Sequence, residues 1–278
     1  MTRLTPSLPS RNLAGAEGTT LPLTYGEYLK LDELLSLQVA QSAGPEHDEM
    51  LFIVIHQVYE LWFKLVLHEV AQIQRSLEAG DAATAQSAFK RVLTIFKTLV
   101  AQVDILETMT PVSFLSFRHR LDTASGFQSL QFREVEIALG ARNPAIAEHY
   151  DEAQRARLAE LLERPSLYDS FLRFLVHRGY AVPEEALRRD LAAPPAESLE
   201  VQRLLVEIYR HDPGTREVCE RMVDLDEGLQ EWRYRHVKMV ERTIGTRRGT
   251  GGSAGAEYLR QTLFKALFPD LWAIRPDL

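Results

Sequence analysis

The chain has 278 residues, 45% of them hydrophobic, so it holds enough apolar material for a substantial core. Its formal net charge is −7 and its basic residues form no dense cluster, which argues against nucleic acid or an anionic membrane as the main partner. The longest apolar run, residues 50–55, is far shorter than the ~20 residues that cross a bilayer, and no secretory signal is visible. The single cysteine, Cys219, excludes an intrachain disulfide. We therefore expect a cytoplasmic protein without a membrane span.

The N-terminal region combines a loosely structured segment with a short helix. Residues 1–20 are rich in Pro, Ser, Thr and Gly, so we expect them to be flexible ahead of a single domain over residues 21–278. Thr24 stands where it can cap a short helix. That helix would carry the apolar side chains Tyr25, Tyr28, Leu29 and Leu31. The pattern alone is also consistent with ordinary docking of this helix on the chain's own core.

A long helix is predicted from His47 to Gly80, with Asp48 and Glu49 in its first turn, where the helix dipole favours negative charge. One face of it carries Phe52, His56, Tyr59, Phe63 and Val66 at helical spacing. A histidine on an apolar face is more often a hydrogen-bonded core side chain than a ligand. His56 by itself therefore does not identify a site.

The next two helices are marked by their capping residues. Asp81 can cap a helix that runs to about Met109. Thr110 is then an N-cap followed by a proline at the first helical position, which predicts a short helix over residues 112–120. Arg118 lies in that short helix, where a solvated surface position is the usual fate of an arginine.

The middle of the chain is punctuated by prolines. A helix is predicted over residues 127–139, several short helices over residues 143–189, and an Ala/Pro linker over residues 191–197. Another helix is expected over residues 198–209. We interpret residues from about 141 to 197 as a helical insertion on one bundle rather than as a second domain.

A second long helix follows the turn at residues 212–215 and ends at Gly245, where a left-handed residue costs little. Its apolar face carries Leu229, Trp232, His236, Met239 and Thr243. His236, like His56, fits an ordinary core position, but two imidazoles on two apolar faces favour a shared pocket.

A glycine-rich stretch and a final helix complete the pattern. Residues 249–253 offer bare backbone N–H groups around the hydroxyl of Thr250, which suits either an anion or a flexible connection. They do not form a P-loop, because no Gly-Lys-Ser/Thr follows. An amphipathic helix is predicted over residues 257–268, ended by Pro269. Since no segment alternates at period two, we expect an all-α fold, a bundle of long helices with a shorter helical insertion.

The residue types narrow the chemistry. A structural zinc site needs four N or S ligands, and neither the zinc-protease motif HExxH nor the hydrolase motif Gly-x-Ser-x-Gly is present. What remains is a metal that needs one protein ligand. Haem is the main case, because the porphyrin supplies four nitrogens and one histidine completes the site. A flat macrocycle between helices would also suit the apolar faces, although such faces usually form only the core.

Five separated segments carry a family resemblance. They are LTYGEYLKLDELL from residue 23, HDEMLFIVIHQVYELWFKL from residue 47, SGFQSLQFREVE from residue 125, EWRYRHVKMVERTIG from residue 231 and RGTGGSAGAEYLR from residue 248. With these segments the chain resembles the tryptophan 2,3-dioxygenase family from about residue 23 to residue 268. The resemblance implies an all-helical homotetramer, a dimer of dimers, that holds haem b with ferrous iron. Such an enzyme inserts both atoms of O₂ across the indole C2–C3 bond of L-tryptophan to give N-formylkynurenine, the first step of tryptophan degradation by the kynurenine route.

The resemblance also implies roles for particular residues. His236 would be the proximal ligand of the haem iron, and His56 the distal catalytic histidine that hydrogen-bonds the indole N–H. Phe52 would contact the indole ring. Arg118 would hold the substrate carboxylate, and Thr250 would bind the ammonium and carboxylate end.

Further residues would complete the pocket. Ser125 and Gly126 would form the turn beside the haem. Tyr25, Tyr28 and Leu29 would reach into the pocket of a neighbouring subunit.

Phe114 departs from the family pattern, in which a tyrosine is expected at this substrate-binding position. A phenyl ring keeps the apolar wall but lacks a hydroxyl that could bond the substrate. This difference suggests an alternative function, that of a related haem monooxygenase that acts on a tryptophan or tyrosine derivative. A non-catalytic haem-binding protein is a further alternative.

Overall fold

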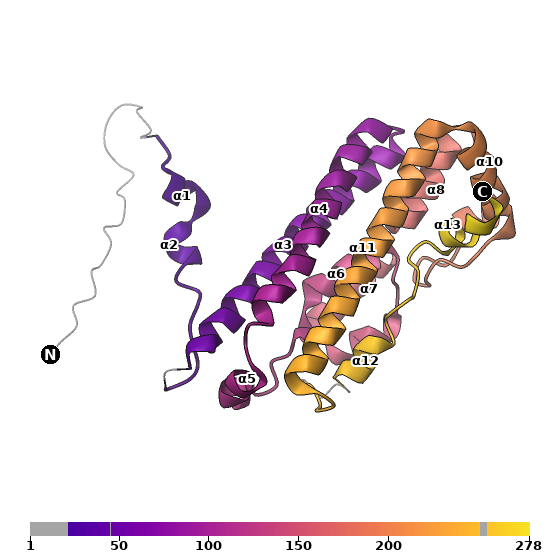
Figure 1. Ribbon diagram of the computed structural model, residues 1–278. Helices are drawn as coiled ribbons and strands as arrows, with labels where there is room; N and C mark the ends of the chain where they lie inside the picture. Colours follow the sequence, from indigo (N-terminus) through magenta and orange to yellow (C-terminus); the bar gives the residue numbers. More distant parts are fainter. Residues whose placement is uncertain (1–21, 45, 251–254) are drawn as a thin grey trace. The chain divides into compact units, whose positions relative to one another are not determined.

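The computed structural model describes residues 22–44, 46–250 and 255–278 (Figure 1). Within these residues the regular elements are helices, with no strand, which confirms the predicted all-α fold. The chain divides into two compact units, Met1–Val39 and Ala40–Leu278, and each is considered by itself.

The division into two compact units does not test the predicted domain boundaries. Residues 1–20, expected to be flexible, lie outside the described residues. A single domain over residues 21–278 with an insertion at about 141–197 stays a prediction.

The first unit contains two short helices, α1 (Tyr25–Leu29) and α2 (Leu31–Leu34). Thr24 caps α1 as predicted, because its hydroxyl accepts the N–H of Glu27 at 3.3 Å and its own N–H bonds the Glu27 carboxylate at 3.0 Å. Lys30 then takes a left-handed conformation, with φ 54°, which separates the two helices. Neither helix contains a buried residue, so the described residues of this unit, 22–39, form no core of their own.

The second unit holds all the longer helices. In chain order they are α3 (His47–Glu78), α4 (Ala82–Leu106), α5 (Pro111–Phe117), α6 (Leu130–Leu139), α7 (Glu152–Leu162), α8 (Leu167–His177), α9 (Glu184–Leu187), α10 (Leu199–His211), α11 (Pro213–Ile244), α12 (Ala256–Arg260) and α13 (Pro269–Ala273). Short 3₁₀ segments are η1 (Arg118–Leu121), η2 (Gly126–Gln128), η3 (Pro144–His149) and η4 (Arg275–Asp277).

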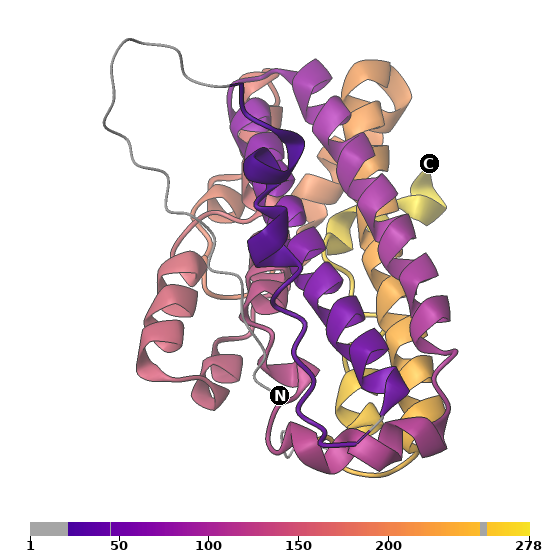
Figure 2. The ribbon, with the colours of Figure 1, turned by 90° about the vertical axis from the view of Figure 1, so that its left-hand side faces the viewer.

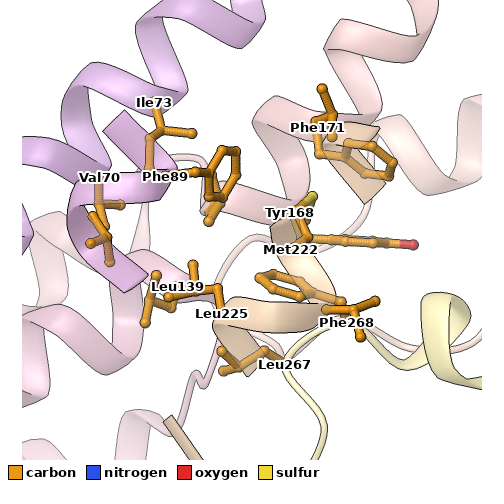
Figure 3. Close-up of a cluster of buried hydrophobic side chains, with 14 of the residues drawn as sticks. Val70, Ile73, Phe89, Leu139, Tyr168, Phe171, Met222, Leu225, Leu267 and Phe268 are labelled. Atoms are coloured by element: carbon orange, nitrogen blue, oxygen red, sulfur yellow. The ribbon is translucent and has the colours of Figure 1, made fainter. Parts of the chain in front are cut away.

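The long helices α3, α4 and α11 run side by side and form the frame of this unit (Figures 1 and 2). Their apolar faces meet with those of α6 and α8 in one core. Figure 3 shows this core where Val70, Phe89 and Phe171 face Met222 and Phe268. The periodic apolar residues seen in the sequence therefore form the packing surfaces of the bundle.

Helix α3 is long and apolar enough to cross a membrane by composition alone. Core helices of bundles meet the same criterion, so this is weak evidence of a span. In the second unit α3 packs against α4, α6 and α8, and Val66, Ile73 and Leu77 on it are fully buried.

The predicted helix starts are formed by side-chain caps. Asp81 accepts the N–H of Thr84 at 3.0 Å at the start of α4, and Thr110 accepts that of Ser113 at 3.1 Å at the start of α5. Asp212 accepts the N–H of Thr215 at 3.0 Å where α11 begins. The caps predicted at Asp81 and Thr110 are therefore confirmed, whereas Asp212, expected only in a turn, caps α11 directly.

Three predicted helices differ in the structure. The helix expected over residues 112–120 ends at Phe117, and Arg118 begins a 3₁₀ segment. Residues 127–129 do not belong to α6, because Ser125 caps a 3₁₀ turn and Ser129 then caps the α-helix. The helix predicted over residues 257–268 ends at Arg260, and Pro269 begins α13 instead of ending a helix. The segment between them is held to α11 by side chains, which compete with helical hydrogen bonding.

The buried carboxylate of Asp226 on α11 provides the strongest of these contacts. One of its oxygens accepts the N–H of Leu267 at 2.8 Å, the N–H of Phe268 at 3.3 Å and the indole N–H of Trp272 at 2.9 Å. Gln230, one turn later, bonds the backbone of Phe264 and Lys265. Helix α11 thus fixes the C-terminal segment to the core.

We expect Asp226→Ala to lower the free energy of unfolding by about 3–5 kcal/mol, because two buried backbone donors and the part-buried indole N–H of Trp272 lose their acceptor. Asp226→Asn keeps one acceptor oxygen and should cost clearly less. Equilibrium urea unfolding measures both. Asp224→Ala is the control, since its half-exposed carboxylate makes a surface ion pair and should cost less than ~1 kcal/mol. Equal losses at positions 224 and 226 would contradict this account.

Candidate active site

A cavity of about 230 Å³ is lined by residues of α3, α4, α5, α6, α11 and α12. Helices α5 and α12 and the end of α11 lie at the lower end of the bundle in Figure 1. The walls of the cavity are largely apolar. The structure brings to it every site residue predicted in the second unit, namely Phe52, His56, Phe114, Arg118, Ser125, Gly126, His236 and Thr250. Residues more than a hundred positions apart in the sequence therefore share one pocket.

His236 lies in the cavity wall on α11, one turn after Trp232. The two rings stack, with centroids 5.2 Å apart and planes 6° apart. Burial lowers the pKa of His236 to about 4, and the nearby His56 and Arg133 add to this because they disfavour another positive charge. The ring is therefore a neutral imidazole, which is the form that ligates metals.

His56 lies on α3, in the same cavity. Its Nδ1 is 2.7 Å from the carbonyl oxygen of Phe52, and because a carbonyl can only accept, Nδ1 carries the proton. Burial lowers the pKa of His56, although the Phe52 carbonyl and Glu60 oppose this. In the neutral ring Nε2 is then left with a lone pair, ready to accept a hydrogen bond from a ligand.

An aromatic cluster packs beside His56. The ring of Phe52 lies 4.0 Å from the His56 ring, 5.8 Å from Phe114 and 5.7 Å from Phe117, measured between centroids. Phe114 and Phe117 meet edge to face at 5.5 Å. Both are buried, so this wall is rigid and apolar, as a flat aromatic ligand requires.

Arg118 and Thr250 form the polar end of the cavity. The Arg118 guanidinium donates to the carbonyl of Arg248 at 2.6 Å, and the Thr250 hydroxyl donates to the carbonyl of Ala124. These two bonds join the segment after α11 to the segment after α5. The predicted glycine-rich loop continues into residues 251–254, which lie outside the described residues.

Buried charges form a further part of the wall, on α6 and α11. The carboxylate of Glu136 bonds Arg133 at 2.5 Å and Arg233 at 2.7 Å, and all three side chains are buried. Burial opposes the charge on Arg133, but Glu136 outweighs it and raises the pKa of Arg133. The Arg133 guanidinium also lies 5.3 Å from the ring of Phe127, in cation–π contact.

This charged network was not predicted from the sequence. One signal was available, because Arg133 and Glu136 are three residues apart and so neighbour each other on a helix. Nothing in the sequence indicated that Arg233, almost a hundred residues later, would complete the group.

Tyr25, Tyr28 and Leu29 lie on α1 in the first unit and are exposed there. Their predicted role in the pocket of another subunit stays a prediction. Among the described residues, no group of three or more His, Cys, Asp or Glu side chains is arranged to hold a metal ion.

The chain is similar to known proteins over most of its length. A family profile described as Tryptophan 2,3-dioxygenase matches residues 12–165 and 201–278. Tryptophan 2,3-dioxygenase of Herpetosiphon aurantiacus is 57% identical over 257 residues, covering 92% of this chain and 98% of the relative. The enzyme of that name from an Anaeromyxobacter species is 58% identical over 260 residues, covering 92% and 96%. The one from Caulobacter vibrioides is 45% identical over 262 residues, covering 92% and 98%.

The chain belongs to the tryptophan 2,3-dioxygenase family. The family expected from the five sequence segments is therefore confirmed, and with it the classification as an oxidoreductase. The profile for the tryptophan 2,3-dioxygenase family leaves out residues 166–200, which fall largely within the proline-punctuated middle of the chain.

We expect Glu136→Gln to lower the free energy of unfolding by about 3–5 kcal/mol, because it leaves two buried guanidinium groups without their shared anion. The control is Glu160→Gln, which removes the carboxylate of an exposed pair with Arg164 and should cost less than ~1 kcal/mol. Urea unfolding of the two variants measures the difference. A loss below ~1 kcal/mol at Glu136 would show that the network contributes little.

Proposed function

We propose that the protein is a haem-dependent dioxygenase that inserts both atoms of O₂ across the indole C2–C3 bond of L-tryptophan, giving N-formylkynurenine. The observation that carries this proposal is one apolar cavity with two neutral imidazoles, His236 and His56, and with Arg118 and Thr250 at its polar end. Membership of the tryptophan 2,3-dioxygenase family supports the same reaction and substrate.

The residues of the cavity fit a haem group. His236 is neutral and lines the cavity, and no hydrogen bond joins its ring nitrogens to another of the described side chains or carbonyls. A single such imidazole is the ligand that a porphyrin iron needs from the protein. The apolar side chains of Leu106, Val237 and Val240 would contact the flat ring, and Ser125 with Gly126 would lie beside it. When bound, haem b with ferrous iron supplies the binding and activation of O₂.

His56 would orient the indole. Its protonated Nδ1 is fixed by the Phe52 carbonyl, so Nε2 can only accept, and the indole N–H is a donor. Burial lowers the pKa of His56, which makes it a weak base and favours a positioning role. The Phe52 ring beside it would contact the indole face.

Arg118 and Thr250 would hold the amino acid end of the substrate. A guanidinium binds a carboxylate through two parallel bonds, and Arg118 uses one of its donors on Arg248 while others remain. The Thr250 hydroxyl and the adjacent glycine backbone allow close approach of the ammonium and carboxylate groups. Both ends of tryptophan would then be fixed, with the indole held by His56.

The assembly and the cellular setting are also proposals. The first unit exposes Tyr25, Tyr28 and Leu29 without burying any residue in its helices, which supports a role for them in a neighbouring subunit of a homotetramer. The acidic composition and the single cysteine, which is buried and free, support the proposal of a cytoplasmic protein without nucleic acid or membrane partners.

A second candidate is favoured by Phe114, whose buried ring provides no hydroxyl at the substrate wall. A related monooxygenase would add one oxygen atom to a tryptophan or tyrosine derivative. Mass spectrometry of the product formed from L-tryptophan under O₂ by the ferrous protein separates the two. We expect a gain of two oxygen atoms; a gain of one would favour the alternative, and unchanged tryptophan would favour a non-catalytic haem protein.

We expect His236→Ala to abolish stable haem binding, whereas His56→Ala should keep haem and weaken only the binding and orientation of the substrate. The reason is that one imidazole would ligate the iron and the other would contact the indole. Absorption spectra of both reduced variants, with and without L-tryptophan, measure this. Histidine ligation that persists in the His236 variant would refute the assignment.

We expect Arg118→Ala to raise the KM for L-tryptophan by about ten- to a hundredfold, since a charge-assisted bond contributes roughly 1.5–3 kcal/mol. Haem absorption should remain as in the unmodified protein. Steady-state kinetics measures the change, with Arg120→Ala, at an exposed position two residues later, as the control. An unchanged KM would remove Arg118 from the substrate site.

A further inference from the structure

A carboxylate on α3 lies in the cavity wall next to His56. Glu60 follows His56 by four positions, so the two side chains lie on the same face of the helix, and both line the cavity. Burial lowers the pKa of His56, and the Glu60 carboxylate opposes this effect. The proposed reaction assigns Glu60 itself no role.

Both carboxylate oxygens of Glu60 accept hydrogen bonds from the segment that begins α6. Oε1 accepts the hydroxyl of Ser129 at 2.5 Å, and Oε2 accepts the side-chain amide of Gln131 at 2.8 Å. The same amide of Gln131 also donates to the main-chain carbonyl of Glu60 at 3.1 Å. These bonds join α3 to a segment about seventy positions later in the sequence.

Ser129 connects this attachment to the start of α6. Its hydroxyl donates to Glu60 and at the same time accepts the N–H of Phe132 at 3.2 Å, as the N-cap of the helix. A hydroxyl that is both donor and acceptor is held in one orientation. The first turn of α6 is therefore fixed to α3 at the level of the cavity.

The 3₁₀ turn directly before Ser129 forms part of the cavity wall. Ser125, Gly126 and Phe127 line the cavity, as Ser129 does. The N–H of Gln128 donates to the Ser125 carbonyl at 2.9 Å, and the N–H of Ser129 donates to the Gly126 carbonyl at 3.1 Å. Because Ser129 closes this turn and is also bonded to Glu60, the position of Glu60 determines where this part of the wall lies.

We propose that Glu60 is a positioning residue that holds residues 125–129, the wall segment, in place so that the cavity retains bound haem. Glu60 acts through Ser129 and Gln131 and does not ligate the iron. This inference rests on the proposed function, since it takes haem as the occupant of the cavity. The hydroxyl of Tyr150 also holds the wall segment, through the Phe127 carbonyl at 3.1 Å, so losing the Glu60 carboxylate loosens the segment without detaching it.

The test compares Glu60→Ala and Glu60→Gln with Glu78→Gln in the full-length holoenzyme. Glu78 is the matched control, because its carboxylate on α3 also accepts a serine hydroxyl from another helix, that of Ser170 on α8 at 2.9 Å, but does not line the cavity. In Glu60→Gln the amide oxygen can still accept the Ser129 hydroxyl, whereas its NH₂ group meets the donor of Gln131. Glu60→Gln should therefore be the milder variant, and it covers the case in which Glu60→Ala folds poorly.

We expect haem to leave Glu60→Ala about tenfold faster than the unmodified protein, because a hydrogen bond to a charged group contributes roughly a factor of ten to an equilibrium constant. Transfer of haem to excess apomyoglobin measures the rate of release, and Glu60→Gln should give a smaller increase. Glu78→Gln should stay within about twofold of the unmodified protein, even if urea unfolding shows a similar loss of stability, because its site is remote from the cavity. Equal rates of release in Glu60→Ala and Glu78→Gln would overturn the proposal.

Amide hydrogen exchange tests whether Glu60 holds the wall segment. In protein kept saturated with haem, the amides of Gln128 and Ser129 should exchange faster in both Glu60 variants and not in Glu78→Gln. Unchanged exchange at these two amides would also overturn the proposal.

The role of Glu60 and the proposed function can fail separately. If the holoenzyme leaves L-tryptophan unchanged but Glu60→Ala alone releases haem faster, the proposed reaction is refuted and the role of Glu60 is supported. If the holoenzyme forms N-formylkynurenine and all variants release haem at the same rate, only the role of Glu60 is refuted. A chain that takes up no haem would overturn both.

Discussion

The site depends on keeping two imidazole rings uncharged inside an apolar wall. Each ring lies in a place where burial opposes protonation, and each is held in position by its own helix. His56 has one nitrogen committed to the carbonyl of Phe52, four residues earlier on α3, whereas His236 is fixed by stacking on Trp232. The bundle must therefore hold α3 and α11 in a fixed relation, since a rotation of either helix would turn its imidazole out of the cavity.

That fixed relation is maintained at two levels of α11. In its first half, Met222 and Leu225 pack in the common core with Phe89, Val92 and Phe96 of α4. Toward the cavity, the ion network of Arg133, Glu136 and Arg233 links α6 to α11. Buried ions need good geometry to be tolerated, so the network adds specificity to a packing that apolar contacts alone would leave less defined.

Much of this arrangement could be predicted from the sequence, because its signals are local. Helical periodicity located α3 and α11, and caps such as Asp81 and Thr110 located where helices begin. His56 and His236 were recognised as inward-facing from the same periodicity. That both rings line one cavity was only a hypothesis, because periodicity does not determine which helices pack together.

Other features required tertiary information. The end of α12 at Arg260 could not be predicted, since it depends on Asp226 and Gln230 bonding the following segment from a different helix. Arg233, the partner of Glu136 on α11, could not be predicted for the same reason. In both cases a side chain far away in sequence overrides the local preference of the backbone.

The hydrogen bonds of Arg118 and Thr250 to main-chain carbonyls have a consequence for selectivity. A zwitterion bound at the polar end would gain mainly from the guanidinium donors of Arg118 that the bond to Arg248 leaves unused. It would gain less from the Thr250 hydroxyl, which already donates to the Ala124 carbonyl. Free indole has the ring without the charged end. It would leave the hydrogen bonds of Arg118 and Thr250 in place and gain only contacts with the aromatic wall. Discrimination between the two would thus arise from the charged end, which only the zwitterion can present to the unused guanidinium donors.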